Sequence, residues 1–161
     1  MVLRLALNAA TLAALVGGLL VVGAAPGLAS ESRPVRAAYA QRVIGHSVAG
    51  RPIVAWHLGE THEPTVVLIA GMHGNEPAPT GILRTLRDGR SVHGIDLWVV
   101  PAYNPDGLAR HSRRNARGVD LNRNYPFHWA PLTGSYYSGP GPASEPETRA
   151  MMGFLRKVRP D

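Results

Sequence analysis

The chain has 161 residues, which is enough for one domain with a buried core. It contains no cysteine, which excludes disulfide bonds, cysteine-ligated zinc and a thiol nucleophile but allows histidine and carboxylate metal sites. The formal net charge of +6 would suit a nucleic-acid partner. However, nearly all the basic residues are arginine, and alanine, glycine and proline are abundant, as in proteins from GC-rich genomes. We therefore predict no nucleic-acid partner.

Residues 1–29 have the layout of a secretory signal. Arg4 is followed by a long apolar run and then by small residues up to Ala29. The apolar run is also long enough for an uncleaved membrane anchor, but its paired glycines and the small residues favour cleavage. In both cases we expect the rest of the chain to be secreted or extracytoplasmic, with no stable membrane partner once the signal is removed. Residues 30–41 are predicted to be a linker and residues 42–161 a single domain.

The first half of this domain is predicted to alternate between strands and helices. Residues 42–59 are predicted to form two short strands around a turn, and the apolar run at 65–70 predicts a central strand covered on both faces. Residues 77–89 have apolar residues at helical spacing and end in glycine, whereas residues 95–100 are typical of another strand. This order predicts an α/β fold.

The second half is predicted to be a long irregular segment followed by one helix. Residues 101–143 are too polar and too rich in glycine and proline for a core, and long loops of this kind often carry function. Within it, residues 104–107 predict a tight turn and residues 119–121 a very short strand. In the helix that follows, Ser144 is predicted to cap the first turn and Glu147 to complete a capping box.

The segment GMHGNEP, residues 71–77, is a candidate metal site because it directly follows a predicted strand. His73 and Glu76 are three residues apart, between glycines that allow the backbone to turn, so both side chains can face one ion. A metal-bound histidine also needs a partner for its second nitrogen, and Asp106 is one candidate. The alternative interpretation is an ordinary strand-to-helix loop with a solvated histidine.

The basic segment from Arg110 to Pro126 has two interpretations. A run of charges is most often a solvated loop. Alternatively, Arg123 grips a carboxylate with its planar guanidinium while Asn122 adds a donor. A carboxylate site beside a metal-activated water is typical of an enzyme that removes the C-terminal residue of a peptide.

Four segments together resemble the M14 family of zinc carboxypeptidases. GMHGNEP, NPDG, RRNARGVDLNRNYP and SEPET occur in the order and spacing of that family, over residues 42–161. The resemblance is greatest to the branch that includes murein peptide amidases. It implies the N-terminal part of a mixed-sheet α/β fold with helices on both faces. It also implies a hydrolase that uses one zinc ion and acts on peptides with a free C-terminal carboxylate, with cell-wall stem peptides among the candidate substrates.

The resemblance also implies roles for five side chains. His73 and Glu76 correspond to the first two zinc ligands. Arg113 corresponds to the residue that polarises the scissile carbonyl and stabilises the oxyanion. Asn122 and Arg123 correspond to the pair that binds the terminal carboxylate of the substrate.

Three further parts of the family pattern are not found in this sequence: a third zinc ligand, a tyrosine that closes over the substrate, and a glutamate general base. Among the other histidines, only His111 and His128 lie in the long loop, and we interpret each as a solvated or capping histidine. We therefore expect the chain to be an incomplete and inactive fragment of a longer enzyme.

Two other functions are kept as alternatives. Zinc deacylases of the aspartoacylase and succinylglutamate desuccinylase kind have a similar HGNE segment, but they act on small cytosolic metabolites. The other alternative is a non-catalytic module that retains the Arg123 site and binds peptide carboxylates without cleaving them.

Overall fold

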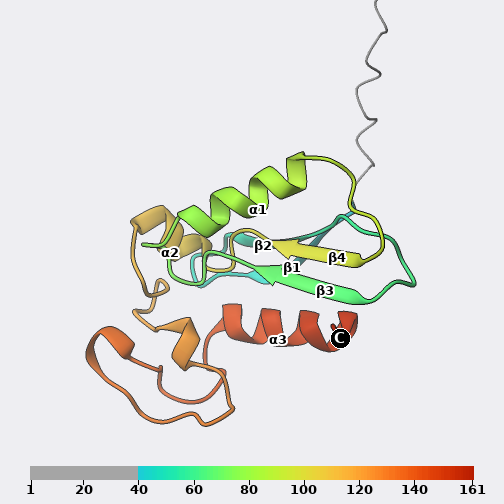
Figure 1. The fold of residues 1–161 in the computed structure, drawn as a ribbon. Helices are drawn as coiled ribbons and strands as arrows, with labels where there is room; N and C mark the ends of the chain where they lie inside the picture. The colour runs from blue at the N-terminus through green and yellow to red at the C-terminus, as the bar shows by residue number, and fades with distance from the viewer. Residues whose placement is uncertain (1–39) are drawn as a thin grey trace, which may run out of the picture. The chain divides into compact units, whose positions relative to one another are not determined.

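The computed structural model describes residues 40–161; the predicted signal and nearly all of the predicted linker lie outside the described residues. Four strands form one sheet in the order β1-β2-β4-β3, with helix α1 on one face and helix α3 on the other (Figure 1). The elements are β1 (Gln41–His46), β2 (Pro52–His57), β3 (Thr65–Ile69), α1 (Ala78–Asp88), β4 (Asp96–Val100), α2 (Pro105–Arg110), the 3-10 helices η1 (Leu121–Arg123) and η2 (Gly134–Tyr136), and α3 (Pro146–Val158). Among residues 40–161 there is no helix with the length and hydropathy needed to cross a bilayer.

The sheet is mixed, which confirms the predicted fold class. β1 pairs antiparallel with β2, and β2 pairs antiparallel with β4. β3 and β4 are parallel, as expected for two strands connected through a helix. The predicted turn between β1 and β2 is present, with Gly50 at a φ of 79°, a backbone angle that favours glycine.

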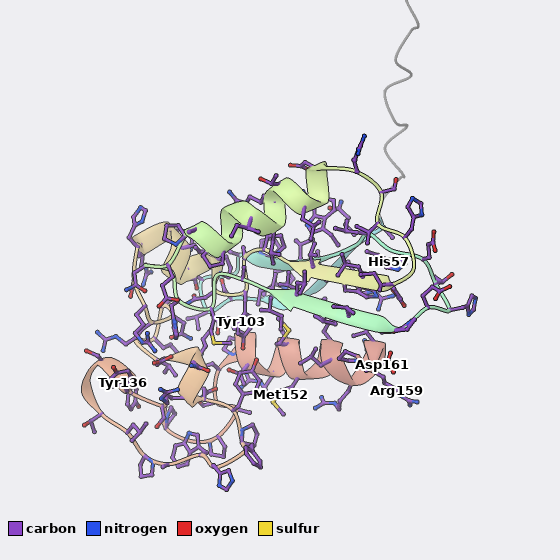
Figure 2. All side chains as sticks on the ribbon, in the orientation of Figure 1. His57, Tyr103, Tyr136, Met152, Arg159 and Asp161 are labelled. Atoms are coloured by element: carbon purple, nitrogen blue, oxygen red, sulfur yellow. The ribbon has the colours of Figure 1, made fainter. Side chains whose placement is uncertain are left out.

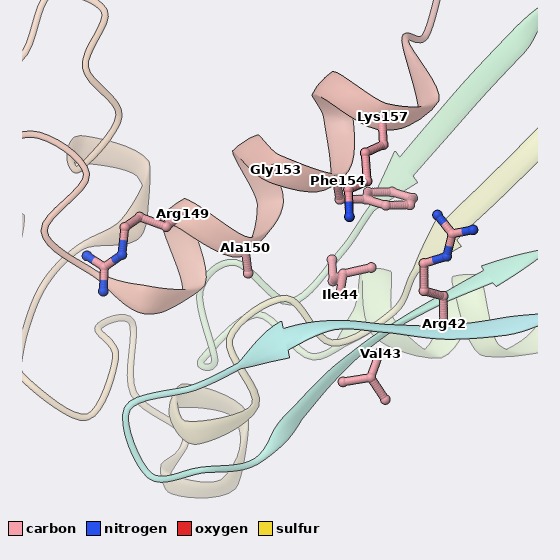
Figure 3. Close-up of a pocket in the computed structure, with 8 residues that line it drawn as sticks. All are labelled: Arg42, Val43, Ile44, Arg149, Ala150, Gly153, Phe154 and Lys157. Carbon is pink, nitrogen blue, oxygen red and sulfur yellow. The ribbon is translucent and has the colours of Figure 1, made fainter.

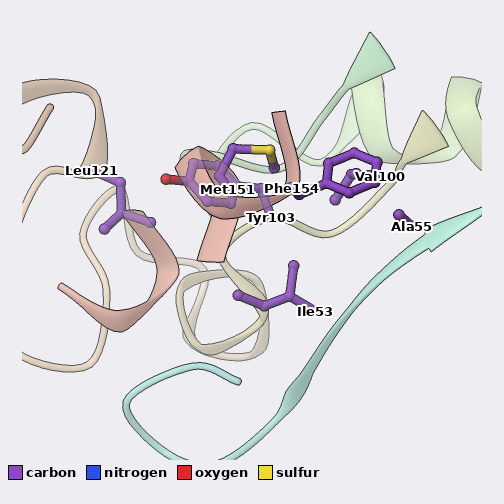
Figure 4. Packing of buried hydrophobic residues seen from close by; sticks show 7 residues of the cluster. All are labelled: Ile53, Ala55, Val100, Tyr103, Leu121, Met151 and Phe154. Carbon is purple, nitrogen blue, oxygen red and sulfur yellow. The ribbon is translucent and has the colours of Figure 1, made fainter. Parts of the chain in front are cut away.

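Two apolar clusters fill the space between the sheet and its helices. Because side chains alternate along a strand, β4 contributes Val100 to the cluster beneath α3 and Val99 to the cluster beneath α1. The α3 cluster includes the buried Tyr103 and Met151 (Figure 4). This packing fixes the ends of β3 and β4, and the loops that carry the candidate site follow those ends.

The predicted central position of β3 is not observed among the described residues. β3 is an edge strand among the described residues, and β2 and β4 are the two inner strands. Leu68 and Ile69 of β3 are each 37% exposed. An unbroken apolar run is typical of a strand covered on both faces, but that pattern reports hydrophobicity and does not determine the order of strands.

The turn predicted at residues 104–107 is instead the start of helix α2. The Asn104 side chain accepts a hydrogen bond from the Gly107 N–H at 2.8 Å, and Pro105 is the first helical residue. Asparagine followed by proline is a turn signal, but the same pair suits the cap and first position of a helix.

The strand predicted at residues 119–121 is also wrong, because Asp120 caps the 3-10 helix η1, which begins at Leu121. The Asp120 carboxylate accepts a hydrogen bond from the Asn122 N–H at 3.0 Å. Such a local side-chain bond competes with extended structure.

Helix α3 begins without the predicted capping box. Its N-cap is Glu145, and no side chain caps the helix. The Ser144 hydroxyl donates to Glu145 instead, while Glu147 is fully buried and accepts a hydrogen bond from the Val48 N–H at 3.0 Å. The sequence matches the capping-box pattern, but both side chains have other partners: Ser144 bonds to the adjacent Glu145, and Glu147 bonds to the distant Val48.

Helix α3 lies very close to β1, because Gly45 leaves room for Ala150; a Cβ at Gly45 would collide with the side chain of Ala150. A groove remains between the two elements (Figure 3). Arg42 and Lys157 stand beside it, and the ring of Phe154 forms part of its wall. None of the predicted site residues lines this groove.

The buried carboxylate of Asp106 ties helix α2 to the turn between β1 and β2. It accepts hydrogen bonds from the Ala49 N–H at 2.9 Å and from the guanidinium of Arg51. Burial raises the pKa of Asp106, but these hydrogen bonds outweigh burial, so the pKa lies below its usual value. This stabilisation is therefore present above the carboxyl pKa of the unfolded chain and is lost as the pH falls through the lowered pKa of the folded chain.

We expect Asp106→Asn to lower the free energy of unfolding at pH 7 by about 1–3 kcal/mol, because a charge-assisted bond from Arg51 is lost. Urea unfolding of the parent and the variant, repeated at decreasing pH, checks this prediction, and the difference should shrink in acid. Glu63→Gln, which alters an exposed carboxylate, is the control. A difference that is independent of pH would contradict the electrostatic explanation.

Candidate functional site

The segment that carries His73 lies across the start of helix α2. The Gly74 N–H donates to the Ser112 carbonyl, and the Asn104 N–H donates to the Gly71 carbonyl, both at 2.9 Å. A Cβ at Gly74 would overlap the backbone of Gly107. Glycine is therefore needed at Gly74 so that the two segments approach closely, and this contact fixes the loop after β3.

His73 is the centre of the site. It is only 9% exposed, and its two ring nitrogens face two different carboxylates. Nδ1 lies 3.3 Å from Oε1 of Glu76, and Nε2 lies 3.0 Å from Oδ1 of Asp120. Because Glu76 is largely exposed whereas Asp120 is fully buried, one side of the imidazole faces solvent and the other faces the protein.

Asp120 is the residue that the sequence interpretation missed. Asp106 was the candidate to orient His73, but its carboxylate is bound at the β1–β2 turn, and the carboxylate of Asp120 contacts His73 instead. One signal could have identified it: Asp120 lies between Val119 and Leu121, and an acidic residue between two apolar residues requires a partner if the segment is buried.

Arg113 contacts both carboxylates that flank His73. Its Nε donates to Oδ2 of Asp120 at 2.9 Å, and its Nη1 lies 3.7 Å from Oε1 of Glu76. The Arg113 side chain as a whole is 27% exposed, so it is not fully enclosed by the protein. The structure thus brings three of the five predicted site residues into one cluster: His73, Glu76 and Arg113.

Asn122 and Arg123 belong to helix η1, which starts directly after Asp120. Asn122 is exposed and Arg123 is half-buried, with Nη1 of Arg123 donating to the Asn122 carbonyl at 3.0 Å. Because Asp120 anchors the first turn of η1, the carboxylate that orients His73 also fixes the position of these two residues.

The other asparagines of the basic segment are structural. Nδ2 of Asn115 donates to the buried carboxylates of Glu145 and Glu147 at 2.7 and 3.2 Å. Nδ2 of Asn124 donates to the Ser138 carbonyl at 2.8 Å. Both amides are buried and hold the long loop against the start of α3, so they are not available to a ligand.

A tyrosine pair connects this loop to the core. The hydroxyl groups of Tyr103 and Tyr125 lie 2.9 Å apart. Burial raises the pKa of Tyr103 and also that of Tyr125, so both phenols are neutral at physiological pH. Tyr125 thereby anchors the chain two residues after Arg123.

The arrangement around His73 fits a zinc ion. If Nε2 donates its hydrogen to Asp120, the lone pair of Nδ1 is free for a metal, and a carboxylate commonly orients zinc-bound histidines in this way. Two ligand atoms on a tetrahedral zinc lie about 3.3 Å apart. The Nδ1–Oε1 separation of 3.3 Å between His73 and Glu76 agrees with this geometry.

A third ligand is not found in the described part of the chain. Between residues 40 and 161, no group of three or more histidine, cysteine, aspartate or glutamate side chains is arranged to hold a metal ion. His111 forms the C-cap of α2, and the ring of His128 packs edge-on against Phe127 with the centroids 4.1 Å apart.

Comparisons with known proteins identify the family. The sequence profile described as zinc carboxypeptidase matches residues 32–161. Murein peptide amidase A of Escherichia coli strain K12 is 31% identical over 134 residues, which cover 72% of this chain and 54% of that protein. Carboxypeptidase SOL1 of Arabidopsis thaliana is 32% identical over 133 residues, which cover 72% of this chain and 26% of that protein.

Solved structures share the fold. The crystal structure of murein-tripeptide amidase MpaA from Escherichia coli O157 matches with a TM-score of 0.63 and 28% identity, over 80% of this chain and 62% of that chain. Carboxypeptidase A from Helicoverpa armigera matches with a TM-score of 0.64 and 23% identity, over 75% of this chain and 38% of that chain.

This chain belongs to the zinc carboxypeptidase family, which confirms the resemblance found in the sequence. It spans about half the length of the curated amidase and about a quarter of the plant carboxypeptidase. The activity and substrate of the whole protein are therefore matters for proposal.

We expect the neutral imidazole of His73 to carry its hydrogen on Nε2, because Asp120 accepts a hydrogen bond there. Long-range ¹H–¹⁵N NMR spectra of the metal-free chain distinguish the two tautomers. In Asp120→Asn the preference should weaken, whereas His57, which pairs through Nε2 with Asp96 at 2.6 Å, should be unaffected. A His73 signal that is identical in parent and variant would contradict the role of Asp120.

Proposed function

We propose that this chain carries metal-binding and carboxylate-binding residues of a zinc metallocarboxypeptidase or peptide amidase. One observation carries the proposal: His73 lies between the carboxylates of Glu76 and Asp120, and Arg113 contacts both of them. Membership of the zinc carboxypeptidase family supports the same hydrolase chemistry.

In this proposal His73 and Glu76 hold the zinc ion, and Asp120 fixes the orientation of the imidazole. When bound, zinc supplies a Lewis acid that activates water and polarises a carbonyl. Arg113 directs its guanidinium towards the carbonyl oxygen of the scissile bond, where negative charge develops.

The terminal carboxylate of the substrate is assigned to Asn122 and Arg123. A guanidinium binds a carboxylate through two parallel hydrogen bonds, which fixes both position and direction. Because Asp120 links helix η1 to His73, the terminal carboxylate is held at a set position relative to the metal.

We further propose a peptide substrate outside the cytoplasm, with peptidoglycan stem peptides as the candidate class. The similarity to murein peptide amidase A supports this class, and the composition of residues 1–29 supports export.

We expect the metal-free chain to bind zinc and His73→Ala to weaken binding by more than tenfold, since loss of a ligand should exceed the ~10-fold minimum typical of second-shell partners. Glu76→Gln should have a similar effect. Isothermal titration with zinc chloride measures both variants.

His111→Ala and His128→Ala are the controls, because both histidines lie in the long loop but outside the His73 cluster. Either control weakening zinc binding as much as His73→Ala would identify a different ligand set. The sequence-based expectation of an inactive fragment stays a prediction, and chelator-sensitive peptide cleavage by the purified chain would contradict it.

We expect Arg123→Ala to weaken binding of a short peptide with a free C-terminus by about 10–100-fold, because a charge-assisted hydrogen-bond pair is lost. The same peptide with an amidated C-terminus should bind weakly to parent and variant alike. Fluorescence anisotropy of the labelled peptide provides the measurement.

Arg156→Ala is the matched control, because Arg156 is an exposed arginine in the last turn of α3. Equal binding of free and amidated peptides by the parent would refute the carboxylate site. Binding that persists in full after removal of zinc would favour the non-catalytic module.

A further inference from the structure

The ring of Tyr136 lies against two of the proposed functional arginines. The guanidinium carbon of Arg113 is 5.3 Å from the ring centroid, and that of Arg123 is 5.6 Å from the same centroid. Both distances are within the range of cation–π attraction. Figure 2 shows Tyr136 at the end of the molecule opposite to His57.

The segment that carries Tyr136 is attached to the site at two further points. The Asp120 N–H donates to the Tyr137 carbonyl at 2.8 Å. Nη1 of Arg114 donates to the Gly134 carbonyl at 3.2 Å. Helix η2 is therefore fixed to the same strip of chain that carries both arginines, although Tyr136 itself is 53% exposed.

We propose that Tyr136 is a positioning residue that holds the guanidinium groups of Arg113 and Arg123 at a set separation. The ring attracts a cation through its face, whereas a guanidinium binds carboxylates and carbonyls through the N–H groups at its edge. The tyrosine can thus remain in contact with both arginines while their edges bind a ligand.

Tyr136 also offsets an electrostatic cost. Two guanidinium groups near one aromatic ring repel each other, and the negative face of the ring reduces this repulsion. The role suits an aromatic side chain, because a carboxylate in the same place would compete with the substrate carboxylate for the arginine N–H groups.

The two arginines depend on Tyr136 to different degrees. Arg113 is also held by Asp120, whose Oδ2 accepts from its Nε at 2.9 Å. Arg123 has no such carboxylate contact among residues 40–161, and its Nη1 donates to the carbonyl of the adjacent Asn122. Removal of the ring should therefore release Arg123 more than Arg113, and so affect carboxylate binding more than oxyanion stabilisation.

The expected effect of Tyr136 on peptide binding rests on the proposed function, but its contact with the two arginines can be measured without any substrate. In NMR spectra of the metal-free chain, the side-chain protons of Arg113 and Arg123 should show shifts from the ring current of Tyr136. Tyr136→Leu removes the ring and Tyr136→Phe retains it. Phe127→Leu is the matched control, because it removes an aromatic side chain that is 83% exposed from the same loop.

We expect Tyr136→Leu to abolish the ring-current shifts, with the larger change at Arg123, and Tyr136→Phe and Phe127→Leu to preserve them. In the peptide-binding assay, Tyr136→Leu should weaken binding of the free-carboxylate peptide about 2–5-fold, the effect of one exposed cation–π contact. Tyr136→Phe should restore it, and the amidated peptide should be unaffected.

Unchanged shifts of both arginines in Tyr136→Leu would overturn the proposal, as would equal losses in Tyr136→Phe and Tyr136→Leu. If the parent fails to distinguish free from amidated peptide, the proposed carboxylate site is wrong. In that case the ring-current shifts alone decide whether Tyr136 holds the two arginines.

Discussion

The buried carboxylate of Asp120 is the constraint on which the rest of the site depends. One oxygen contacts His73 and accepts from the Asn122 N–H, and the other accepts from Arg113. Its backbone N–H donates to the Tyr137 carbonyl. Burying the Asp120 carboxylate is tolerated only because it has these hydrogen-bond partners. The chain around His73, Arg113, Asp120 and Tyr137 must therefore come together for the site to be stable.

The strands and helices around the sheet could be predicted because their signals are local. Residues 77–89 and 95–100 show the periodicity of the elements that they form, and glycine ends the first helix as expected. The errors arise where one local signal fits two kinds of structure, or where a residue far away in the sequence binds a side chain that was predicted to act locally. Asn104 suits a turn or a cap, and Glu147 is drawn away from a capping box by Val48, which is 99 residues distant in the sequence.

The candidate site shows the same division. His73 and Glu76 are three residues apart in a glycine-containing loop, so their proximity follows from the sequence alone. Asp120 is 47 residues from His73, and its position between two apolar residues indicates that it needs a partner but not that the partner is His73. Only the crossing of the His73 loop over helix α2, which depends on close packing at Gly74, decides between the two carboxylates.

The site contains two neighbouring regions of opposite charge. Around His73, two carboxylates face one guanidinium, so with a neutral imidazole the cluster carries an excess of negative charge that favours a bound cation. The neighbouring region around Arg123 is positively charged, which favours a bound anion. In the proposed function, the carboxylate of a peptide would bind to Arg123, and its last amide carbonyl would face the cation held by the His73 cluster.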